Sequence, residues 1–455
     1  MARERLIGAA LPVPHDICAA REYGRAAAPG KPATHSGHLF PQMLSRLEPV
    51  VPVLLGVTLA QLALGALTPL VSIRLAQHDE PTPYIGLVAS AYFVGFLAGS
   101  LTCDRIVDRV GHIRAFAVFA ALAADCAMLH TTTSAPLAWG VLRAVTGFAM
   151  AGVFLIVESW LNAKVDAASR SRIFAAYLFV TWSASAVGPQ ALNVAHPFES
   201  FLFILIAMGF VTALVPMALT QISNPEIAGR TRFGIKKLFA ISPLGVVACF
   251  ASGLVNSAFY GLVPVYGKAI GLDAQTLSAL LTTALVGGLV AQYPIGMLAD
   301  RFGRRPVMLA GLIIASLLAV AIILVHGRSY LALVTLVFLY AGTTAPLYGL
   351  GVGQTNDYIL PKDFVGASGG LLFAWALGAT AGPTVASSVM GGLGPHGLFV
   401  YIAGVLATIA GFTVFRMLRR TGLPIAQQTS FVPAPQTPPG IAELDPRAAA
   451  AGESD

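Results

Sequence analysis

The chain has 455 residues, of which 56% are hydrophobic and only 11% are charged. Soluble domains carry about 25% charged residues, so this composition excludes a soluble globular protein and, for most of the chain, intrinsic disorder. Cys18, Cys103, Cys126 and Cys249 show no paired spacing, which excludes a disulfide scaffold. What remains is a protein that crosses a membrane many times.

Residues 1–49 precede the first apolar run and mix Pro, His and charges of both signs. They contain no apolar core of the kind found in a signal peptide. The sequence therefore predicts a disordered cytoplasmic lead over 1–49. Met43 could also be the natural start, since it stands directly before the first apolar run.

Twelve apolar runs follow, each long enough to cross a bilayer as a helix. In chain order they are 50–73, 83–103, 113–131, 136–161, 173–193, 201–220, 241–266, 274–299, 306–326, 329–353, 364–391 and 397–418. Their length and their lack of apolar–polar alternation exclude membrane-spanning strands. The sequence predicts an all-α integral membrane protein with twelve transmembrane helices.

The distribution of Lys and Arg predicts how these helices are oriented. Of the 28 Lys and Arg residues, 24 lie in the lead, the tail or the loops on the same side as both, three lie on the other side (Arg74, Lys268 and Arg328), and Arg143 is inside a span. Because Lys and Arg are enriched in cytoplasmic loops, both termini are expected in the cytoplasm. The net charge of +7 then marks orientation and contact with lipid headgroups, not a nucleic-acid surface.

Two loops resemble each other at an offset of 192 residues: Asp104–Arg114 reads DRIVDRVGHIR and Gly296–Arg305 reads GMLADRFGRR, with Gly111 aligned to Gly303. Gly-Pro recurs at 188–189 and 382–383, an offset of 194. We therefore expect two parallel six-helix bundles as pseudo-repeats, 50–220 and 241–418, joined by a central cytoplasmic loop, 221–240. Six prolines after residue 418 predict a disordered cytoplasmic tail over 419–455.

Twelve spans in two halves, with DRFGRR between spans 8 and 9, resemble the major facilitator superfamily over residues 50–418. Arg143, Gly147 and Ala151 match a second family pattern, R-x-x-x-G-x-x-x-A. V-E-S at 157–159, Y-G-L-V-P-V-Y at 260–266 and N-D at 356–357 are similar to the YcaD-type bacterial branch. The resemblance implies transport by alternating access of two helical bundles, and it implies little about the cargo.

The resemblance also assigns a gating role to the two similar loops. Their Asp and Arg residues would pair across the halves in the outward-open state, and breaking the pairs would let the cytoplasmic side open. Their glycines permit tight turns, and the arginines of the second loop are expected at the cytoplasmic face near anionic lipid. Alternatively, these charges only set topology. The gating candidates are Asp108, Arg109, Gly111, Asp300, Arg301, Gly303, Arg304 and Arg305, with Asp166 as a partner for the first loop.

Three ionisable residues lie inside predicted spans, where burial is costly and a function is the default hypothesis. Arg143 and Glu158 are 15 residues apart, on one face of span 4 and about 22 Å apart along its axis. Since this span lines the cavity in the family, we interpret Arg143 as a structural or coupling residue and Glu158 as the proton-carrying carboxylate. Alternatively, Glu158 is interfacial and pairs with Lys164. Asp125, in span 3, could serve coupling or a buried hydrogen bond.

Polar and aromatic residues on the expected cavity-lining spans could bind the cargo, because transport sites place a few polar groups in an apolar pocket. For each of them alone, packing is the alternative. The candidates are Gln61, Trp182, Gln190, Asn256, Tyr260, Tyr340, Tyr348 and Trp375. Together they predict an amphipathic or weakly polar cargo.

The sequence thus predicts a secondary active transporter that moves a small organic solute across the bacterial inner membrane, coupled to protons, with efflux favoured over uptake. The alternative is a membrane sensor or structural protein that keeps the fold without transport. An enzyme is not expected, because catalytic residues do not converge at one depth. Gly261–Ala269 fails as a phosphate-binding loop, and we expect no cofactor and no metal site. The expected partners are the solute, protons and the lipid bilayer, with no nucleic acid and with the monomer as the functional unit.

Overall fold

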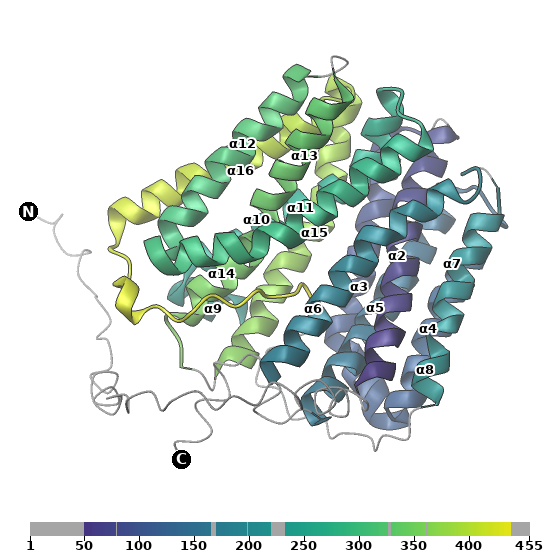
Figure 1. Ribbon diagram of the computed structural model, residues 1–455, viewed down its shortest axis with the longest axis horizontal. Helices are drawn as coiled ribbons and strands as arrows, with labels where there is room; N and C mark the ends of the chain where they lie inside the picture. Colours follow the sequence, from purple (N-terminus) through teal and green to yellow (C-terminus); the bar gives the residue numbers. More distant parts are fainter. Residues whose placement is uncertain are drawn as a thin grey trace, which may run out of the picture. The chain divides into compact units, whose positions relative to one another are not determined.

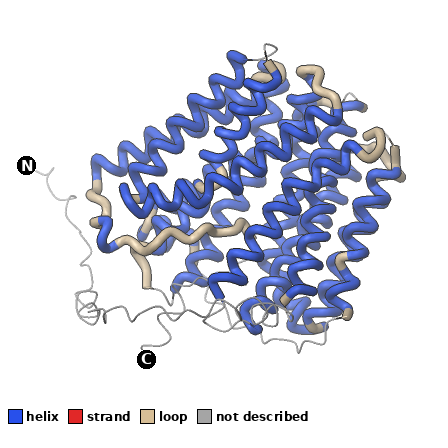
Figure 2. The backbone as a smooth tube through the Cα atoms, viewed as in Figure 1, coloured by secondary structure: helices blue, strands red, loops and turns tan. Residues whose placement is uncertain are grey.

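The computed structural model describes residues 50–78, 80–164, 170–197, 199–219, 233–325, 329–360 and 363–437. Within these ranges the chain forms helices joined by short connections, and no strand occurs among them (Figures 1 and 2). The predicted disordered lead, 1–49, lies outside the described residues. So do 220–232, which make up most of the predicted central loop; its last part forms the short helix α9 (Ile235–Ile241).

The described helices fall into two halves that follow the predicted spans closely. The N half contains α2 (Val51–Gln77), α3 (Thr82–Val110), α4 (His112–Leu129), α5 (Pro136–Lys164), α6 (Arg170–Val187), the 3₁₀ helix η3 (Gly188–Asn193), α7 (Phe201–Thr212) and α8 (Leu214–Ala218). After α9, the C half contains α10 (Pro243–Ala269), α11 (Ala274–Phe302), α12 (Arg304–Val325), α13 (Tyr330–Thr344), α14 (Leu347–Asn356), α15 (Phe364–Leu393) and α16 (Gly397–Arg419).

The prediction of an all-α membrane protein is confirmed, and the predicted count of twelve spans is compatible with the structure. Within the described residues, eleven segments are long and apolar enough to cross a membrane, with α7–α8 and α13–α14 each counted as one. The remaining predicted span, 173–193, corresponds to α6 with η3, which is not among these eleven. The structure splits the predicted spans 201–220 and 329–353 because a proline lies at or just after each break, Pro216 in α8 and Pro346 before α14. Proline has no N–H to continue the helical ladder, and its ring clashes with the preceding turn.

Three helices of the C half begin at side-chain caps. Ser242 accepts a hydrogen bond from the backbone N–H of Gly245, and Ser329 accepts one from Ala332. At the start of α11, Asp273 accepts from the N–H of Thr276 at 2.8 Å, and hydrogen bonds from Thr276 lower the pKa of this exposed carboxyl. A cap of this type stabilises a helix, because the side-chain oxygen satisfies a backbone N–H that has no partner within the helix. At Asp273 the contribution is present above the usual carboxyl pKa and is lost as the pH falls through the lowered value.

The internal repeat reappears as two matching turns. Gly111 ends α3 with a φ of 84°, and Gly303 ends α11 with a φ of 87°. Each donates its backbone N–H to the carbonyl four residues earlier, Val107 at 2.8 Å and Ala299 at 2.9 Å. Positive φ is readily adopted only by glycine, so both loops depend on it. The expected role of these two glycines in tight turns agrees with this geometry.

Two glycines allow α3 and α5 to pack unusually closely in the N half. A Cβ added at Gly95 would lie 1.7 Å from the carbonyl oxygen of Ala144, and one at Gly147 would lie 1.9 Å from that of Tyr92. Small residues allow helices in membranes to approach backbone to backbone. Gly147, which the sequence analysis placed in a family motif, therefore has a packing reason to be glycine.

We expect Gly95→Ala to destabilise the protein by about 1–3 kcal/mol, because the added methyl group must push two backbones apart. Gly140→Ala is the matched control, since nothing lies within 4 Å of the added Cβ there. Thermal unfolding of both variants in detergent micelles measures the difference. Equal melting temperatures for the two variants would contradict this account of the α3–α5 contact.

Candidate transport site

The two halves make their main contacts near one end of the helix bundle, the end that holds the turn after Gln77, which we call the opposite end. The other end holds Val50 and Arg420, and we call it the terminal end. The helix pairs that join the halves are α2 with α10, α3 with α15, and α6 and η3 with α11. Near the opposite end, Ser72 donates to the carbonyl of Gly261 at 2.8 Å, and the Ser90 and Thr384 hydroxyls are 2.8 Å apart.

A cluster of neutral polar side chains completes this closure between η3 and α11. Gln190 donates to the hydroxyl of Thr282 at 2.7 Å and to the carbonyl of Ser278 at 3.2 Å. Asn193 donates to the Ser278 hydroxyl at 2.9 Å. Such hydrogen bonds contribute only about 1 kcal/mol each, so the closure can be broken and remade. Gln190, a predicted cavity residue, thus lies in the seal between the halves.

We expect Gln190→Ala to loosen the opposite end, because it removes two hydrogen bonds across the halves, worth about 1 kcal/mol each. A cysteine placed at Ala89, which packs against Gly261 across the halves, should react faster with a membrane-impermeant maleimide in this background than in the parent, by about tenfold. Gln275→Ala is the matched control, since Gln275 is exposed at the start of α11. Equal rates in the two backgrounds would show that Gln190 does not hold the seal.

Aromatic rings connect the halves at the middle of the bundle. Trp375 of α15 lies edge-on to Phe93 and Phe96 of α3, with ring centroids 5.8 and 6.0 Å apart. On its other side, the centroid of Tyr348 of α14 is 6.4 Å from that of Trp375. The indole N–H of Trp375 is buried, and no hydrogen-bond partner for it occurs in the described part of the chain. A buried donor without a partner is costly, so this N–H is suited to donate a hydrogen bond to a polar atom of a cargo.

Arg143 is enclosed within the N half, and its side chain is 3% exposed. It donates to the Thr68 hydroxyl at 3.2 Å, and its guanidinium lies 4.7 Å from the centre of the Tyr92 ring. These contacts join α2, α3 and α5, all of one half. Of the two roles that the sequence left open for Arg143, this geometry favours the structural one.

Glu158 lies deep between helices at the terminal half of α5 and is 0% exposed. Its carboxylate accepts a hydrogen bond from the Tyr177 hydroxyl of α6 at 3.4 Å. Tyr348 of the C half lies close enough to interact electrostatically with it. Glu158, Tyr177 and Tyr348, which we call the Glu158 cluster, thus bring both halves to one buried carboxylate. This burial differs from an interfacial position, whereas the alternative pair with Lys164 involves a side chain outside the described part of the structure.

The remaining cavity candidates have more ordinary surroundings. Gln61 donates to Ser185 at 3.1 Å inside the N half, and Asn256 donates to Ser252 at 3.1 Å along α10. Trp182 of α6 lies over Gly288 of α11, so it contributes to the contact between halves. Tyr260 and Tyr340 lie around Phe259 in the C half. Asp125 is on an exposed face of α4, away from the enclosed position of Glu158.

The gating candidates of the first loop lie at the surface of the terminal end, where Asp108 and Arg109 are exposed; Asp166 lies outside the described residues. In the second loop, Arg301 is exposed and its guanidinium lies 5.3 Å from the ring centre of Phe302. The cross-half pairs that the resemblance implies belong to a state with a closed terminal end. The structure instead has close contacts at the opposite end.

Arg304 corrects the expectation that the arginines of this loop face lipid headgroups. It is 1% exposed, and its Nε lies 2.7 Å from Oδ2 of Asp357, which follows α14. Gly353 makes room for it, because a Cβ there would lie 2.0 Å from the guanidinium. Its neighbour Arg305 donates to the Tyr358 hydroxyl at 2.7 Å. The loop is thus attached to the end of α14 by buried charge.

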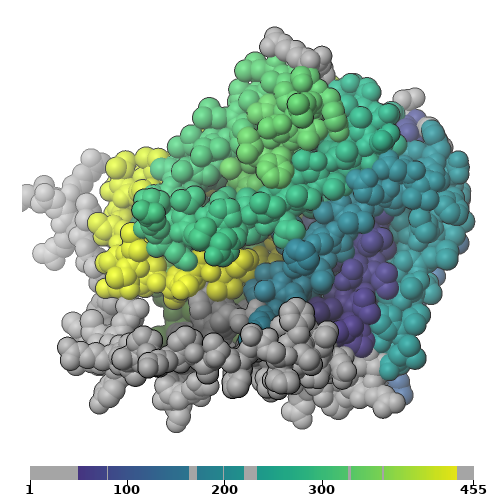
Figure 3. All heavy atoms as spheres, in the orientation of Figure 1, coloured from purple at the N-terminus to yellow at the C-terminus, as the bar shows by residue number. Residues whose placement is uncertain are grey.

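The predicted tail also differs from expectation over part of its length. Residues 420–437, which we call the tail segment, run along the terminal end of the C half toward α6 (Figures 1 and 3), with one short 3₁₀ turn at Ile425–Gln427. Its prolines prevent a helix, but an extended chain can still bind through its backbone. Residues 438–455 lie outside the described residues.

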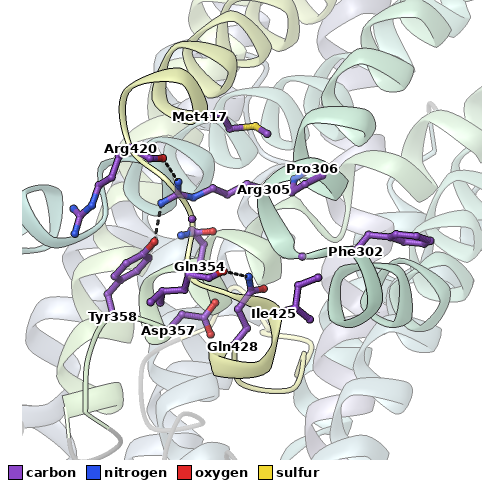
Figure 4. A pocket seen from close by; sticks show the side chains of 13 residues that line it. Phe302, Arg305, Pro306, Gln354, Asp357, Tyr358, Met417, Arg420, Ile425 and Gln428 are labelled. Atoms are coloured by element: carbon purple, nitrogen blue, oxygen red, sulfur yellow. Dashed lines mark hydrogen bonds between the residues drawn. The ribbon is translucent and has the colours of Figure 1, made fainter. Parts of the chain in front are cut away.

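The tail segment encloses a cavity of about 250 Å³ against α12, α14 and α16. Figure 4 shows Arg305 between Tyr358 and the backbone of Arg420, which accepts a hydrogen bond at 2.8 Å. The side chains of Gln354, Asp357 and Gln428 face the same space. This cavity lies at the terminal end of one half and is separate from the Glu158 cluster.

Sequence reasoning did not identify Tyr177, Asp357 as the partner of Arg304, or the tail segment. Tyr177 is one aromatic residue within an apolar span, and no spacing links it to Glu158. Asp357 was visible as part of the N-D pair of the branch. The tail had only its prolines as a signal, and these indicate an extended chain without indicating what it contacts.

Comparison with known proteins identifies the family to which this chain belongs. The family model of the Major Facilitator Superfamily matches residues 53–287 and 245–444. The chain belongs to the major facilitator superfamily. It is 27% identical over 368 residues to the uncharacterized MFS-type transporter YcaD of Salmonella newport, covering 80% of this chain and 94% of that protein. To the YcaD protein of Salmonella typhi it is 27% identical over 384 residues, covering 83% and 98%.

Solved structures share the fold at low identity. The nucleoside transporter NupG superposes with a TM-score of 0.70 and 12% identity, covering 81% of this chain and 99% of that chain, in a mutant form. A bacterial homologue of the human lysosomal transporter Spinster, solved inward-facing and unoccupied, gives a TM-score of 0.67 and 14% identity, covering 86% and 99%. The protein is therefore a multi-pass membrane transporter of the YcaD type that moves a small molecule, and not an enzyme.

Proposed function

We propose that this superfamily member is a proton-coupled secondary transporter of a small, weakly polar organic solute in the bacterial inner membrane, working as a monomer with its terminal end in the cytoplasm and with efflux favoured over uptake. The observation that carries the proposal is the fully buried Glu158, which accepts a hydrogen bond from Tyr177 of its own half and lies within electrostatic range of Tyr348 of the other half. A carboxylate at such a position changes its surroundings whenever the halves move, so its affinity for a proton follows the conformational state.

The aromatic rings beside this carboxylate support the proposal of a weakly polar organic cargo. Trp375, Phe96 and Tyr348 offer ring faces and edges at the level of the Glu158 cluster. Transport pockets bind organic molecules through such apolar walls with a few polar groups for orientation. The buried charges near this contact are few: Glu158, and Arg143, which contacts Thr68 and Tyr92 of its own half and keeps one guanidinium nitrogen without a hydrogen-bond partner among the described residues. A highly charged cargo would lack matching charges here, whereas an amphipathic or weakly polar one fits.

Reconstitution tests the proposal. Purified protein in liposomes with an imposed pH gradient is screened against a library of small organic solutes, with a pH-sensitive dye trapped in the lumen. We expect at least one weakly polar solute to accelerate the decay of the pH gradient, and the gradient to drive its accumulation. A cargo whose flux neither moves protons nor responds to the gradient would refute proton coupling. Flux driven only by sodium would do the same.

A further inference from the structure

The tail segment packs against helices of the bundle at its far end, where residues 431–437 are each half-buried. Phe431 occupies the space beside two glycines, since a Cβ at Gly296 of α11 would lie 2.4 Å from its ring and one at Gly349 of α14 would lie 3.3 Å from it. Gly296 is six residues before the end of α11, about 9 Å inside the terminal end. Phe431 therefore fills a hollow between helices that only glycine leaves open.

The segment then continues from the C half to the N half. The backbone nitrogen of Ala434 lies near Gly349, and Thr437 lies close to Tyr177 of α6, although its hydroxyl has no hydrogen-bond partner in the described part of the chain. Tyr177 is a member of the Glu158 cluster. Figure 2 shows this stretch as an extended loop across the helices. Residues 429–437 thus bridge the two halves at the terminal end, next to the proposed coupling carboxylate.

Specific polar contacts anchor the segment just before it enters. Oδ1 of Asp357 accepts hydrogen bonds from the backbone N–H and the hydroxyl of Thr429, both at 3.0 Å, and Arg304 donates to that hydroxyl at 3.0 Å. Asp300 accepts from the backbone N–H of Phe431 at 2.8 Å. Hydrogen bonds to charged groups are among the stronger ones. The anchors are therefore Asp300 and Arg304 of the loop between α11 and α12, together with Asp357 at the end of α14.

This location has a mechanical consequence. Alternating access requires the terminal end to close when the opposite end opens, which brings α6 and α5 toward α11 and α14. Packed helices leave no room for an aromatic side chain between them. Asp300, a gating candidate for a pair across the halves, is already engaged by the backbone of Phe431. The tail segment and the closed terminal end therefore compete for the same space and for the same carboxylate.

We infer that the space between α11, α14 and α6 at the terminal end is a peptide-binding site, and that the chain's own residues 429–437 occupy it. This segment inhibits transport by holding the opposite end closed until it leaves. The inhibition needs no particular cargo or coupling ion, so it stands apart from the proposed function. Release of the segment shifts the population toward the state with an open opposite end.

The test uses the full-length protein in lipid nanodiscs and two readouts. Hydrogen–deuterium exchange reports whether the amides of Thr429 and Phe431 are protected, and maleimide labelling of Ala89→Cys reports opening of the opposite end, where Ala89 packs against Gly261. We expect Phe431→Ala to speed exchange in residues 425–437 by about tenfold and to raise labelling by about tenfold, since it removes the half-buried aromatic ring that packs beside Gly296 and Gly349. Phe415→Ala is the matched control, because Phe415 is 50% exposed on α16; it should change neither readout.

Thr429→Val is a second variant that keeps the aromatic ring and Asp300 and removes the hydroxyl that donates to Asp357 and accepts from Arg304; it should move both readouts in the same direction by a smaller factor. Rapid exchange of the tail amides in the unmodified protein would show that the segment does not bind. Faster exchange in Phe431→Ala with unchanged labelling at residue 89 would show that it binds without controlling the conformation. Either result would overturn the inference, and neither depends on whether Glu158 carries a proton.

Discussion

Glu158→Gln should reduce proton-driven transport in liposomes to the level of protein-free vesicles, while exchange of cargo down its own gradient continues. Glutamine is nearly isosteric and can still accept from Tyr177, so the packing of a side chain that is 0% exposed is preserved. It cannot bind and release a proton, however, and the coupling between proton and cargo is lost. Solute accumulation under an imposed pH gradient, compared with counterflow at equal pH, separates these two effects.

Two companion variants make this result interpretable. Asp125→Asn neutralises a carboxylate on an exposed face of α4 and should leave coupled transport unchanged. Tyr177→Phe removes the hydrogen bond to Glu158 and should slow coupled transport by about three- to tenfold, the range for one lost hydrogen bond. If Glu158→Gln accumulates solute as well as the unmodified protein does, the proton passes elsewhere and the assignment of Glu158 fails.

Arg304→Gln should lower the free energy of unfolding by about 3–5 kcal/mol, the cost of leaving one charge of a buried ion pair without its partner. Arg304 and Asp357 are 1% and 2% exposed in this pair, and their closest atoms are 2.7 Å apart. Burial removes the screening that makes surface ion pairs weak. Chemical unfolding in detergent micelles, followed by tryptophan fluorescence, measures the change.

Arg301→Gln, three residues earlier and exposed, is the control and should change stability by less than about 0.5 kcal/mol. The double variant Arg304→Gln with Asp357→Asn should be less destabilised than the sum of the two single variants, because it removes both charges together. A melting profile of Arg304→Gln that matches that of Arg301→Gln would mean that the buried pair does not support the fold. Additive effects in the double variant would mean that the two residues do not act as a pair.

The extent of the helices was predictable because membrane insertion is decided by local composition. The predicted span 136–161 became Pro136–Lys164, and 364–391 became Phe364–Leu393. The matching turns at Gly111 and Gly303 were predictable too, since a repeated loop with a glycine at the same place imposes the same backbone. The helix breaks at Pro216 and Pro346 were not predicted, because the mean hydropathy of a segment does not change when one backbone hydrogen bond is missing.

The candidate site was predictable only in part. An ionisable residue inside a span is costly in any arrangement, which is why Glu158 stood out from the sequence. Whether a partner lies opposite it depends on helix rotation and contact between distant segments, and the sequence carries no direct signal for either. Arg304 shows the reverse case: its pattern predicted a surface arginine, and burial against Asp357, 53 residues away, made it structural.

Hydropathy and the repeated loops, which act over about 20 residues at a time, were sufficient to predict a membrane protein with two similar helical halves. The tertiary structure alone decided which polar groups meet: Gln190 in the seal, Tyr177 and Tyr348 around Glu158, and Phe431 between two glycines. These contacts depend on packing between segments that are far apart in the chain. Small side chains determine how closely two helices approach, and a single aromatic ring can fill the space between them.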